Sequence, residues 1–473
     1  MTTTPQCDPF CNLEFSPAVN TAIALADKQV YAFFSVLGDF RFEDGSYGMN
    51  RQALYLHQLA LGLVEQGCQV DIFIRREHPD QPEIVEHRLG LRTICLTAGP
   101  VMAIPHTQLL DYIPSFVSAW LAFQRQFKRN YVLFQTSDWL SGWIGLQLKN
   151  QLGIPLVHTS WAIAALKYLW LETTTITSIR QSVERMCIAQ ADCVVAGSPQ
   201  EVAYLRQMIS VSGQIKVVPH GINTQPFEIL SPAAARQKLG VSPDTRLILY
   251  VGPFAPFKGI ETLIRACTFL PKSFQLYLVS DNSEDEMDLQ QQQYIRALVK
   301  QFDLDKHIVF TGIVPRSYLP AYYAAANVCV VPSYYETSGS VSLESMASGT
   351  PVIASAIGEL RYVVRHGQTG LLVLPFNPDA LATGIWDALV NSSRWHFYGL
   401  AGQHWVRTRF SFTVAATQML DLYRSLIPMK KVKAYSLFKH PVSIYRKLHQ
   451  LAGANLSEQS ARFISNQRRE FFY

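Results

Sequence analysis

Two glutamates separated by a small-residue loop are the residues of this chain best suited to chemistry. Glu336 and Glu344 stand eight residues apart, with Ser338, Gly339 and Ser340 between them. The segment predicts the end of a strand, a short loop and a helix that carries Glu344. At the start of such a helix the backbone amides of Ser338 to Ser340 point outward, where they can hold a diphosphate.

The predicted helix places Glu344 between two small residues. Ser340 lies one turn before it and Ser348 one turn after it, which leaves room around the carboxylate. A carboxylate can accept hydrogen bonds from both hydroxyls of a ribose, so Glu344 is a candidate nucleoside contact. The alternative is a glutamate that only complements the helix dipole. For Glu336 the alternative is an ordinary acid on a surface loop.

The elements that must position these residues follow an alternating pattern. Short apolar runs alternate with longer amphipathic segments, which is typical of parallel α/β layers. Strands of the first half are predicted at residues 30–36, 69–74, 93–96, 131–135, 155–159, 193–196 and 215–218, and its clearest helices at 52–66, 114–127 and 177–190. A second set of strands is predicted at 247–251, 276–279, 308–311, 328–331 and 351–355. Two such sets predict an α/β fold of two Rossmann-like, doubly wound domains facing across a cleft.

Several motifs of the second half resemble those of family 4 (group 1) glycosyltransferases. They occur in order as Val251-Gly252, Phe257-Lys258-Gly259, residues 311–315 (Thr-Gly-Ile-Val-Pro), the Glu336/Glu344 segment, Gly358-Glu359-Leu360 and residues 366–373. The first half is similar to the sucrose-phosphate-synthase-like and inositol-phosphate-glycosyltransferase-like members at residues 69–73, 155–159 and 218–223. The resemblance implies the GT-B fold, in which two Rossmann-like domains close over a nucleotide-sugar.

The two sets of strands, together with the resemblance, predict a domain plan whose boundary falls near residues 231–244. An N-terminal acceptor-side domain would cover residues 1–242, and a C-terminal nucleotide-sugar-binding domain residues 243–405. A helix within 406–428 would pack back toward the N-terminal domain, and 429–473 would form a basic extension.

The family's chemistry assigns roles to the motif residues. Transfer from a nucleotide-sugar expels a diphosphate, and a site without a metal can stabilise it with a cation and a helix N-terminus. Lys258 fits the family position for that cation, although an isolated loop lysine is more often merely solvated. Glu336 would contact the donor sugar and support the transition state, and Glu344 would hold the ribose. Donor binding would further involve Ser338, Gly339, Ser340 and Ile313.

Four family positions are altered in this chain. The arginine that shares the diphosphate with the lysine is replaced by Pro253, and one glycine pair is replaced by Asn50-Arg51, with Gly48 nearby. An active-site histidine is replaced by Trp161, and a second glycine pair by Ser280-Asp281. One interpretation is rewiring, in which the Arg51 guanidinium takes the place of the lost arginine. The other is a protein that keeps the fold without transfer activity.

We therefore expect a retaining glycosyltransferase of the hexosyltransferase class that moves a sugar from a nucleoside diphosphate sugar to an unidentified hydroxyl acceptor. No cofactor is expected, because the implied chemistry is metal-independent. The competing hypothesis is a catalytically impaired glycosyltransferase-like protein that binds a nucleotide or a partner.

Composition and charge limit the partners and the compartment. The 473 residues are 48% hydrophobic and 16% charged, which predicts a well-packed globular protein. Eight scattered cysteines without a zinc spacing favour reduced core thiols in a cytoplasmic protein. Residues 430–473 carry a net charge of +7 and the rest −2, so the body gives no sign of nucleic-acid binding. The basic tail could contact an anionic membrane surface, or it could be a solvated extension.

Overall fold

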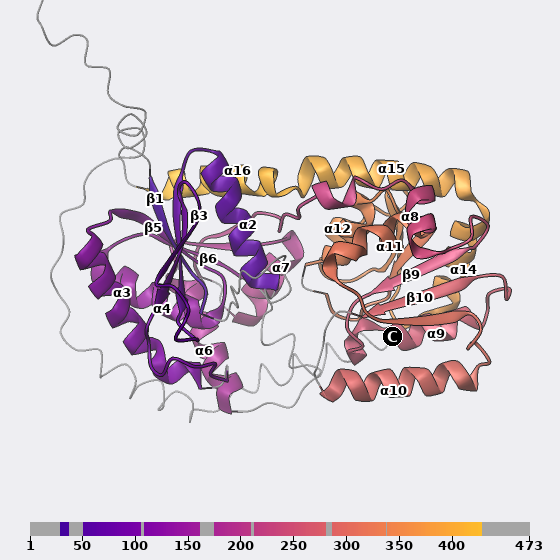
Figure 1. Ribbon diagram of the computed structural model, residues 1–473, viewed down its shortest axis with the longest axis horizontal. Coiled ribbons are helices and arrows are strands. Elements are labelled where there is room, and N and C mark those ends of the chain that lie inside the picture. Colours follow the sequence, from indigo (N-terminus) through magenta and orange to yellow (C-terminus); the bar gives the residue numbers. More distant parts are fainter. Residues whose placement is uncertain are drawn as a thin grey trace, which may run out of the picture.

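A computed structural model describes residues 29–36, 51–105, 108–160, 175–209, 212–280, 286–336 and 338–427. Within these ranges the chain forms two sheets, and helices flank each sheet. The two halves lie side by side in Figure 1. The helices α15 (Ser392–Arg409) and α16 (Phe412–Leu426), drawn in yellow, run along the top of both halves. The predicted α/β fold of two Rossmann-like domains is confirmed.

The sheet of the N-terminal domain is parallel except at one edge. Its strands, in the order β3-β4-β2-β1-β5-β6-β7-β8, are β1 (Val30–Phe34), β2 (Gln69–Arg75), β3 (Ile84–Arg88), β4 (Leu91–Leu96), β5 (Tyr131–Thr136), β6 (Leu156–Thr159), β7 (Cys193–Ala196) and β8 (Ile215–Val217). The sequence did not indicate β3, the only antiparallel strand of this sheet. Its residues alternate between exposed and half-buried, so it lacks the apolar run by which the buried strands were found.

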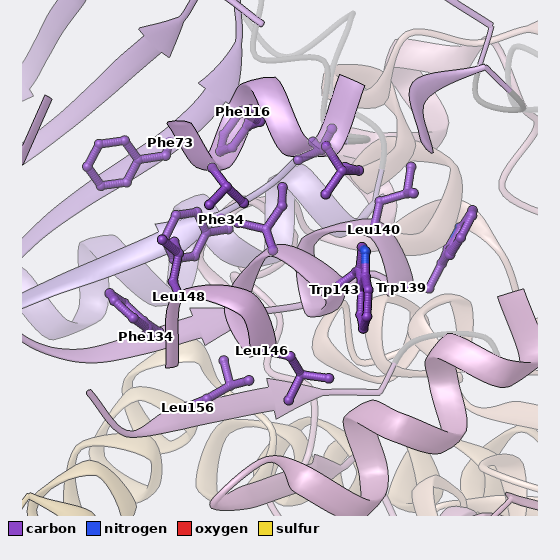
Figure 2. Close-up of a cluster of buried hydrophobic side chains, with 14 of the residues drawn as sticks. Phe34, Phe73, Phe116, Phe134, Trp139, Leu140, Trp143, Leu146, Leu148 and Leu156 are labelled. Atoms are coloured by element: carbon purple, nitrogen blue, oxygen red, sulfur yellow. The ribbon is translucent and has the colours of Figure 1, made fainter. Parts of the chain in front are cut away.

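Helices cover both faces of this sheet. They are α2 (Arg51–Glu65), η1 (Leu109–Tyr112), α3 (Ile113–Phe127), α4 (Trp139–Leu152), α6 (Thr175–Gln190), α7 (Pro199–Tyr204) and the π-turn η2 (Leu205–Ile209). Figure 2 shows Phe34 of β1 between Phe73, Phe116 and Phe134, at ring-centroid distances of 5.5 to 6.5 Å. Most residues of α4 are buried, so it lacks the polar face that would have marked it as an amphipathic helix.

The sheet of the C-terminal domain is fully parallel. Its order is β11-β10-β9-β12-β13-β14, with β9 (Leu247–Val251), β10 (Gln275–Ser280), β11 (Ile308–Ile313), β12 (Val328–Val331), β13 (Val352–Ser355) and β14 (Gly370–Val373). The chain winds outward from β9 in one direction to β11 and then from β12 in the other. In open α/β sheets the crevice at such a reversal, outside the carboxyl ends of the strands, is where ligands bind.

The helices of the C-terminal domain complete its two faces. They are η3 (Gln225–Phe227), α8 (Pro232–Leu239), η4 (Pro256–Lys258), α9 (Ile260–Cys267), α10 (Glu286–Gln301), η5 (Arg316–Tyr318), α11 (Leu319–Ala325), α12 (Ser340–Ala347), α13 (Leu360–Val363) and α14 (Pro378–Val390). Helix α8 packs against α11, and Ala235 shares a small buried cluster with Leu247 of β9. By its packing, α8 therefore belongs to this domain.

The chain passes between the domains twice, and the two passages pair with each other. The Ile222 amide donates to the Phe410 carbonyl at 2.7 Å, and the Phe412 amide donates to the Ile222 carbonyl at 3.1 Å. A Cβ on Gly221 would lie 2.9 Å from Phe412 Cα, so glycine permits this close approach. After the second passage α16 packs on α2, and the Tyr423 hydroxyl donates to Gln135 Oε1 at 2.8 Å.

Several features singled out in the sequence lie outside the described residues. They are Gly48, Asn50, Trp161, Asp281, two of the eight cysteines (Cys7 and Cys11) and the basic extension 429–473. The six described cysteines are free thiols and all are buried. None of the helices in the described ranges is both long and apolar enough to cross a membrane. The membrane contact of the tail stays a prediction.

Candidate functional site

The loops that follow β9 and β12 touch each other at the reversal of strand order. The Tyr334 amide donates to the Phe257 carbonyl at 2.7 Å. Gly259 has a φ of +68°, and a Cβ there would lie 2.0 Å from the Pro332 carbonyl oxygen. Only glycine fits both the backbone conformation and this contact. The fold thereby brings together two motifs that stand more than seventy residues apart in the sequence.

This contact pairs the two predicted chemical groups. Lys258 Nζ lies 2.7 Å from Glu336 Oε2, and the two side chains are only 14% and 5% exposed. The Ser333 hydroxyl lies 3.4 Å from the same carboxylate oxygen. A mostly buried ion pair with hydrogen-bonded neighbours holds both groups in place, and it makes the removal of either partner costly.

The helix start predicted at the loop lies next to this pair. Gly339 precedes α12 with a φ of +58°, and Val363 of α13 lies 3.1 Å from where its Cβ would be. The helix begins at Ser340, and Leu343 donates to the Gly339 carbonyl at 3.0 Å. The positive end of the α12 dipole therefore faces the region between Ser338 and Ser340.

Glu344 is held by two donors in this structure. Arg316 Nη2 donates to Oε1 at 2.7 Å, and the Tyr323 hydroxyl donates to Oε2 at 2.9 Å. Glu344 and Tyr323 are buried, whereas the Arg316 side chain is 40% exposed. Both oxygens of the carboxylate therefore accept a hydrogen bond from a side chain, and one of the two donors is an exposed arginine.

A cleft of about 590 Å³ opens between the two domains at this point. Its lining comes from α2, from the paired interdomain passages and from the C-terminal domain. The lining residues that bear on the predicted site are Ser338, Ser340, Glu344, Arg316, Lys238 and His220. Lys258 and Glu336 are not among the lining residues. The structure therefore brings the loop serines and Glu344 to the cleft, and Lys258 to Glu336 beside it.

The remaining predicted residues are spread around this centre. Ile313 ends β11 and is exposed, and Arg51 is the first residue of α2. The Pro253 carbonyl, at the position where the family carries arginine, accepts a hydrogen bond from the Tyr250 hydroxyl at 2.7 Å. Among the described residues no group of three or more His, Cys, Asp or Glu is arranged to hold a metal ion.

Sequence reasoning missed three groups of this cleft. Arg316 directly follows the quoted 311–315 motif, so its place in the chain was a usable signal. Lys238 lies on α8, and no local signal in the sequence points from it to the cleft. His220 belonged to the 218–223 motif but was given no role. Burial lowers the pKa of His220 to about 4, so the ring is neutral near pH 7.

Comparisons with known proteins match both halves of the chain. The family described as "Glycosyl transferases group 1" matches residues 233–403, and the "Glycosyl transferase 4-like domain" matches residues 52–221. The D-inositol 3-phosphate glycosyltransferase of Corynebacterium glutamicum is 32% identical over 403 residues, which cover 82% of this chain and 94% of that protein. The D-inositol 3-phosphate glycosyltransferase of Thermobispora bispora is 30% identical over 385 residues, which cover 80% of this chain and 89% of that protein.

Solved structures show the same architecture. The sucrose-phosphate synthase from Thermosynechococcus elongatus has a TM-score of 0.75 and 39% identity, and the match covers 84% of this chain and 99% of that one. The Anabaena protein HepE, solved in complex with UDP and glucose, has a TM-score of 0.65 at 19% identity. The match covers 84% of this chain and 100% of that one. The second likeness concerns the fold alone.

Proposed function

Because the chain belongs to the group 1 glycosyltransferases of GT-B type, we propose that it moves a sugar from a nucleoside diphosphate sugar to a hydroxyl acceptor, with retention of configuration. The observation that carries this proposal is the Lys258–Glu336 pair at the strand-order reversal of the C-terminal domain, next to the start of α12. A cation, a carboxylate and a helix N-terminus meet there, as departure of a diphosphate requires.

The first step is donor binding in the interdomain cleft. The ribose hydroxyls would donate hydrogen bonds to Glu344, share its carboxylate with the Tyr323 hydroxyl, and displace the exposed Arg316 from Oε1. An arginine displaced in this way stays in the cleft, where it can contact the phosphates or the base. Rewiring through Arg316 therefore needs no arginine at position 253. It is an alternative to the rewiring through Arg51 expected from the sequence.

The second step is the departure of the diphosphate. Its negative charge grows as the bond to the sugar breaks, and Lys258 and the start of α12 would stabilise it without a metal. As Lys258 turns toward the phosphate, Glu336 is released from the ion pair. Its carboxylate would then face the positive charge that develops on the sugar, which favours bond breaking.

The acceptor in this proposal is a phosphorylated polyol or sugar. The D-inositol 3-phosphate glycosyltransferases and the sucrose-phosphate synthase, by their names, are both associated with phosphate esters. The Corynebacterium glutamicum and Thermobispora bispora proteins and the sucrose-phosphate synthase each match at least 80% of this chain at 30% identity or more. Both names support an acceptor class without selecting one member of it.

Calorimetric titration of the full chain with UDP, GDP and ADP, each separately, tests donor binding. Binding of one nucleotide is expected, and binding of none of the three would contradict the proposal. Incubation of the matching nucleotide-sugar with inositol phosphate or a hexose phosphate tests transfer, and NMR of the product gives the anomeric configuration. Nucleotide binding without transfer to any phosphorylated or free polyol would favour the impaired glycosyltransferase instead.

A further inference from the structure

A buried contact joins the two domains on the side of the Lys258–Glu336 pair. The Ser198 hydroxyl of the N-terminal domain donates a hydrogen bond to Glu359 Oε1 of the C-terminal domain. Ser198 precedes α7 and Glu359 precedes α13, so each sits at a helix start. Both residues are buried. The contact spans 161 positions of sequence and exists only while the domains are together.

A second buried carboxylate lies next to this contact. The Glu201 amide donates to the Ser198 hydroxyl oxygen at 3.1 Å, and Glu201 Oε2 accepts from the Gly197 amide at 2.7 Å. Among the described residues neither Glu201 nor Glu359 has a lysine, arginine or histidine within ion-pair distance. Two acids therefore face each other across the domain boundary without a cation to balance them.

Other charged and titratable groups lie around these two acids, and none of those that the structure describes forms an ion pair with either acid. The described groups that interact electrostatically with Glu201, with Glu359 or with the half-buried Tyr335 include Glu336 with its partner Lys258, Arg180 and Glu184 of α6, Tyr55 of α2, and Tyr362 of α13. His220, near Gly197, is neutral through burial. Arg180 is paired with Glu184 at 2.8 Å.

The two acids retain protons to unusually high pH. Burial raises the pKa of Glu359 to about 8, helped by the charge of Glu201 and opposed by the Ser198 hydrogen bond. Burial likewise raises the pKa of Glu201 to about 7, opposed by the hydrogen bonds from Gly197 and Ser160. Near neutral pH the pair therefore carries at most one full charge in the arrangement seen here.

In the described part of the chain, the two interdomain passages form a narrow connection between the domains. The two interdomain passages meet at Ile222, Phe410 and Phe412, where two backbone hydrogen bonds and the close approach at Gly221 form a compact pivot. Rotation about a pivot of a few residues is how two-domain proteins open and close around ligands. Such a rotation would separate Ser198 from Glu359.

We infer that Ser198 and Glu359 form a proton-dependent latch, which holds the domains closed while Glu359 carries a proton and releases them when Glu201 and Glu359 are both ionised. The pair acts by positioning the N-terminal domain over Glu336 and takes no part in bond breaking. The inference concerns the fold itself and does not depend on the identity of donor or acceptor.

The direction of the pH effect follows from the two states. In the open state water reaches Glu359, and its pKa returns toward its ordinary value near 4.5, whereas the closed state raises it to about 8. A carboxyl whose pKa is raised by closure favours the closed state fully below pH 4.5 and loses that contribution as pH rises to 8. The ratio of closed to open molecules should fall by up to about tenfold per pH unit for each such carboxyl.

Small-angle X-ray scattering of the full chain, without ligands, tests the latch at intervals from pH 5.5 to 8.5. The wild-type radius of gyration is expected to grow as the pH rises. Glu359→Gln keeps an oxygen acceptor for Ser198 and cannot ionise, so this variant is expected to stay compact over the whole range. Glu83→Gln, an exposed carboxyl-to-amide change in the N-terminal domain, is the matched control and should expand as the wild type does.

Two results would overturn the inference: a wild-type radius that does not change with pH, or a change that persists undiminished in Glu359→Gln. Circular dichroism identifies a variant that has failed to fold. Glu201→Gln then supplies a second test from the opposite domain, and it must weaken the pH dependence. Ser198→Ala, which removes the donor, is expected to be expanded already at pH 5.5.

Discussion

Lys258 Nζ and Glu336 Oε2 lie 2.7 Å apart, although 78 positions of sequence separate the two residues. The loop contact at Gly259 and Pro332 fixes this distance, because the strand order of the sheet reverses between β9 and β12. Each of these two mostly buried charges is compensated by the other, so neither would be stable at this position alone. In the proposed mechanism, a donor phosphate that attracts Lys258 also releases Glu336 from the ion pair, so the pair would couple the charge of the leaving diphosphate to the charge that develops on the sugar.

Replacing Lys258 with methionine should lower both the rate of sugar transfer and the stability of the fold. Loss of the cation that stabilises the leaving diphosphate is expected to lower kcat by about a hundredfold or more. The same change leaves Glu336 buried without its ion partner, which is expected to cost about 3 kcal/mol of stability. Steady-state kinetics and urea unfolding measure the two effects.

A double variant separates these effects. In Lys258→Met combined with Glu336→Gln the uncompensated charge is gone, so stability should recover while activity stays absent. Lys272→Met, at an exposed lysine paired with Asp303, is the matched control for both measurements. Recovery of activity together with stability would show that Lys258 only supports the fold.

Replacing Glu344 with glutamine should weaken nucleotide binding. An amide presents one acceptor where the carboxylate presents two, and it has no charge for the ribose hydroxyls or for Arg316. We expect the Kd for the nucleotide to rise by about tenfold or more, since a charge-assisted hydrogen bond contributes about 1.5 to 3 kcal/mol. Calorimetry measures it. Glu228→Gln, which alters the exposed pair with Arg407, should bind as the wild type does.

The sequence indicated most of the strands and singled out the segment around Glu336 and Glu344 because both are local signals. Buried parallel strands are short apolar runs, and the pair at positions 336 and 344 needs only one loop and one helix turn. The partners of those residues are not local. Arg316 reaches Glu344 through the packing of α11 on α12, and Ser198 reaches Glu359 across the domain boundary. Such contacts follow from chain topology, which a periodicity pattern does not contain.

Replacing Tyr423 with phenylalanine should weaken the attachment of α16 to the N-terminal domain. The Tyr423 hydroxyl donates to Gln135 Oε1 at 2.8 Å, and its ring lies 5.1 Å from that of Tyr31. The substitution keeps the ring and leaves a buried acceptor unpaired, which costs about 1 to 3 kcal/mol. Urea unfolding measures the loss, and Tyr398→Phe on α15 is the control. An unchanged free energy of unfolding in Tyr423→Phe would mean that α16 is held by apolar packing alone.

Replacing His158 with glutamine should reduce the acid sensitivity of the N-terminal domain. His158 Nδ1 lies 2.8 Å from Thr136 Oγ1, and burial lowers the pKa of the ring to about 4 from an ordinary value near 6.5. A base whose pKa is lowered by folding contributes stability that is present above pH 6.5 and is lost as pH falls toward 4. Below that window the protein must unfold, or hold a buried charge, in order to take up the proton.

The measurement is the free energy of unfolding as a function of pH. Its slope between pH 6.5 and 4 should decrease in His158→Gln by about 1.4 kcal/mol per pH unit, the equivalent of one proton. His396→Gln, at an exposed position on α15, should keep the wild-type slope. Equal slopes in His158→Gln and the wild type would show that the ring is already charged, or already exposed, in the folded protein.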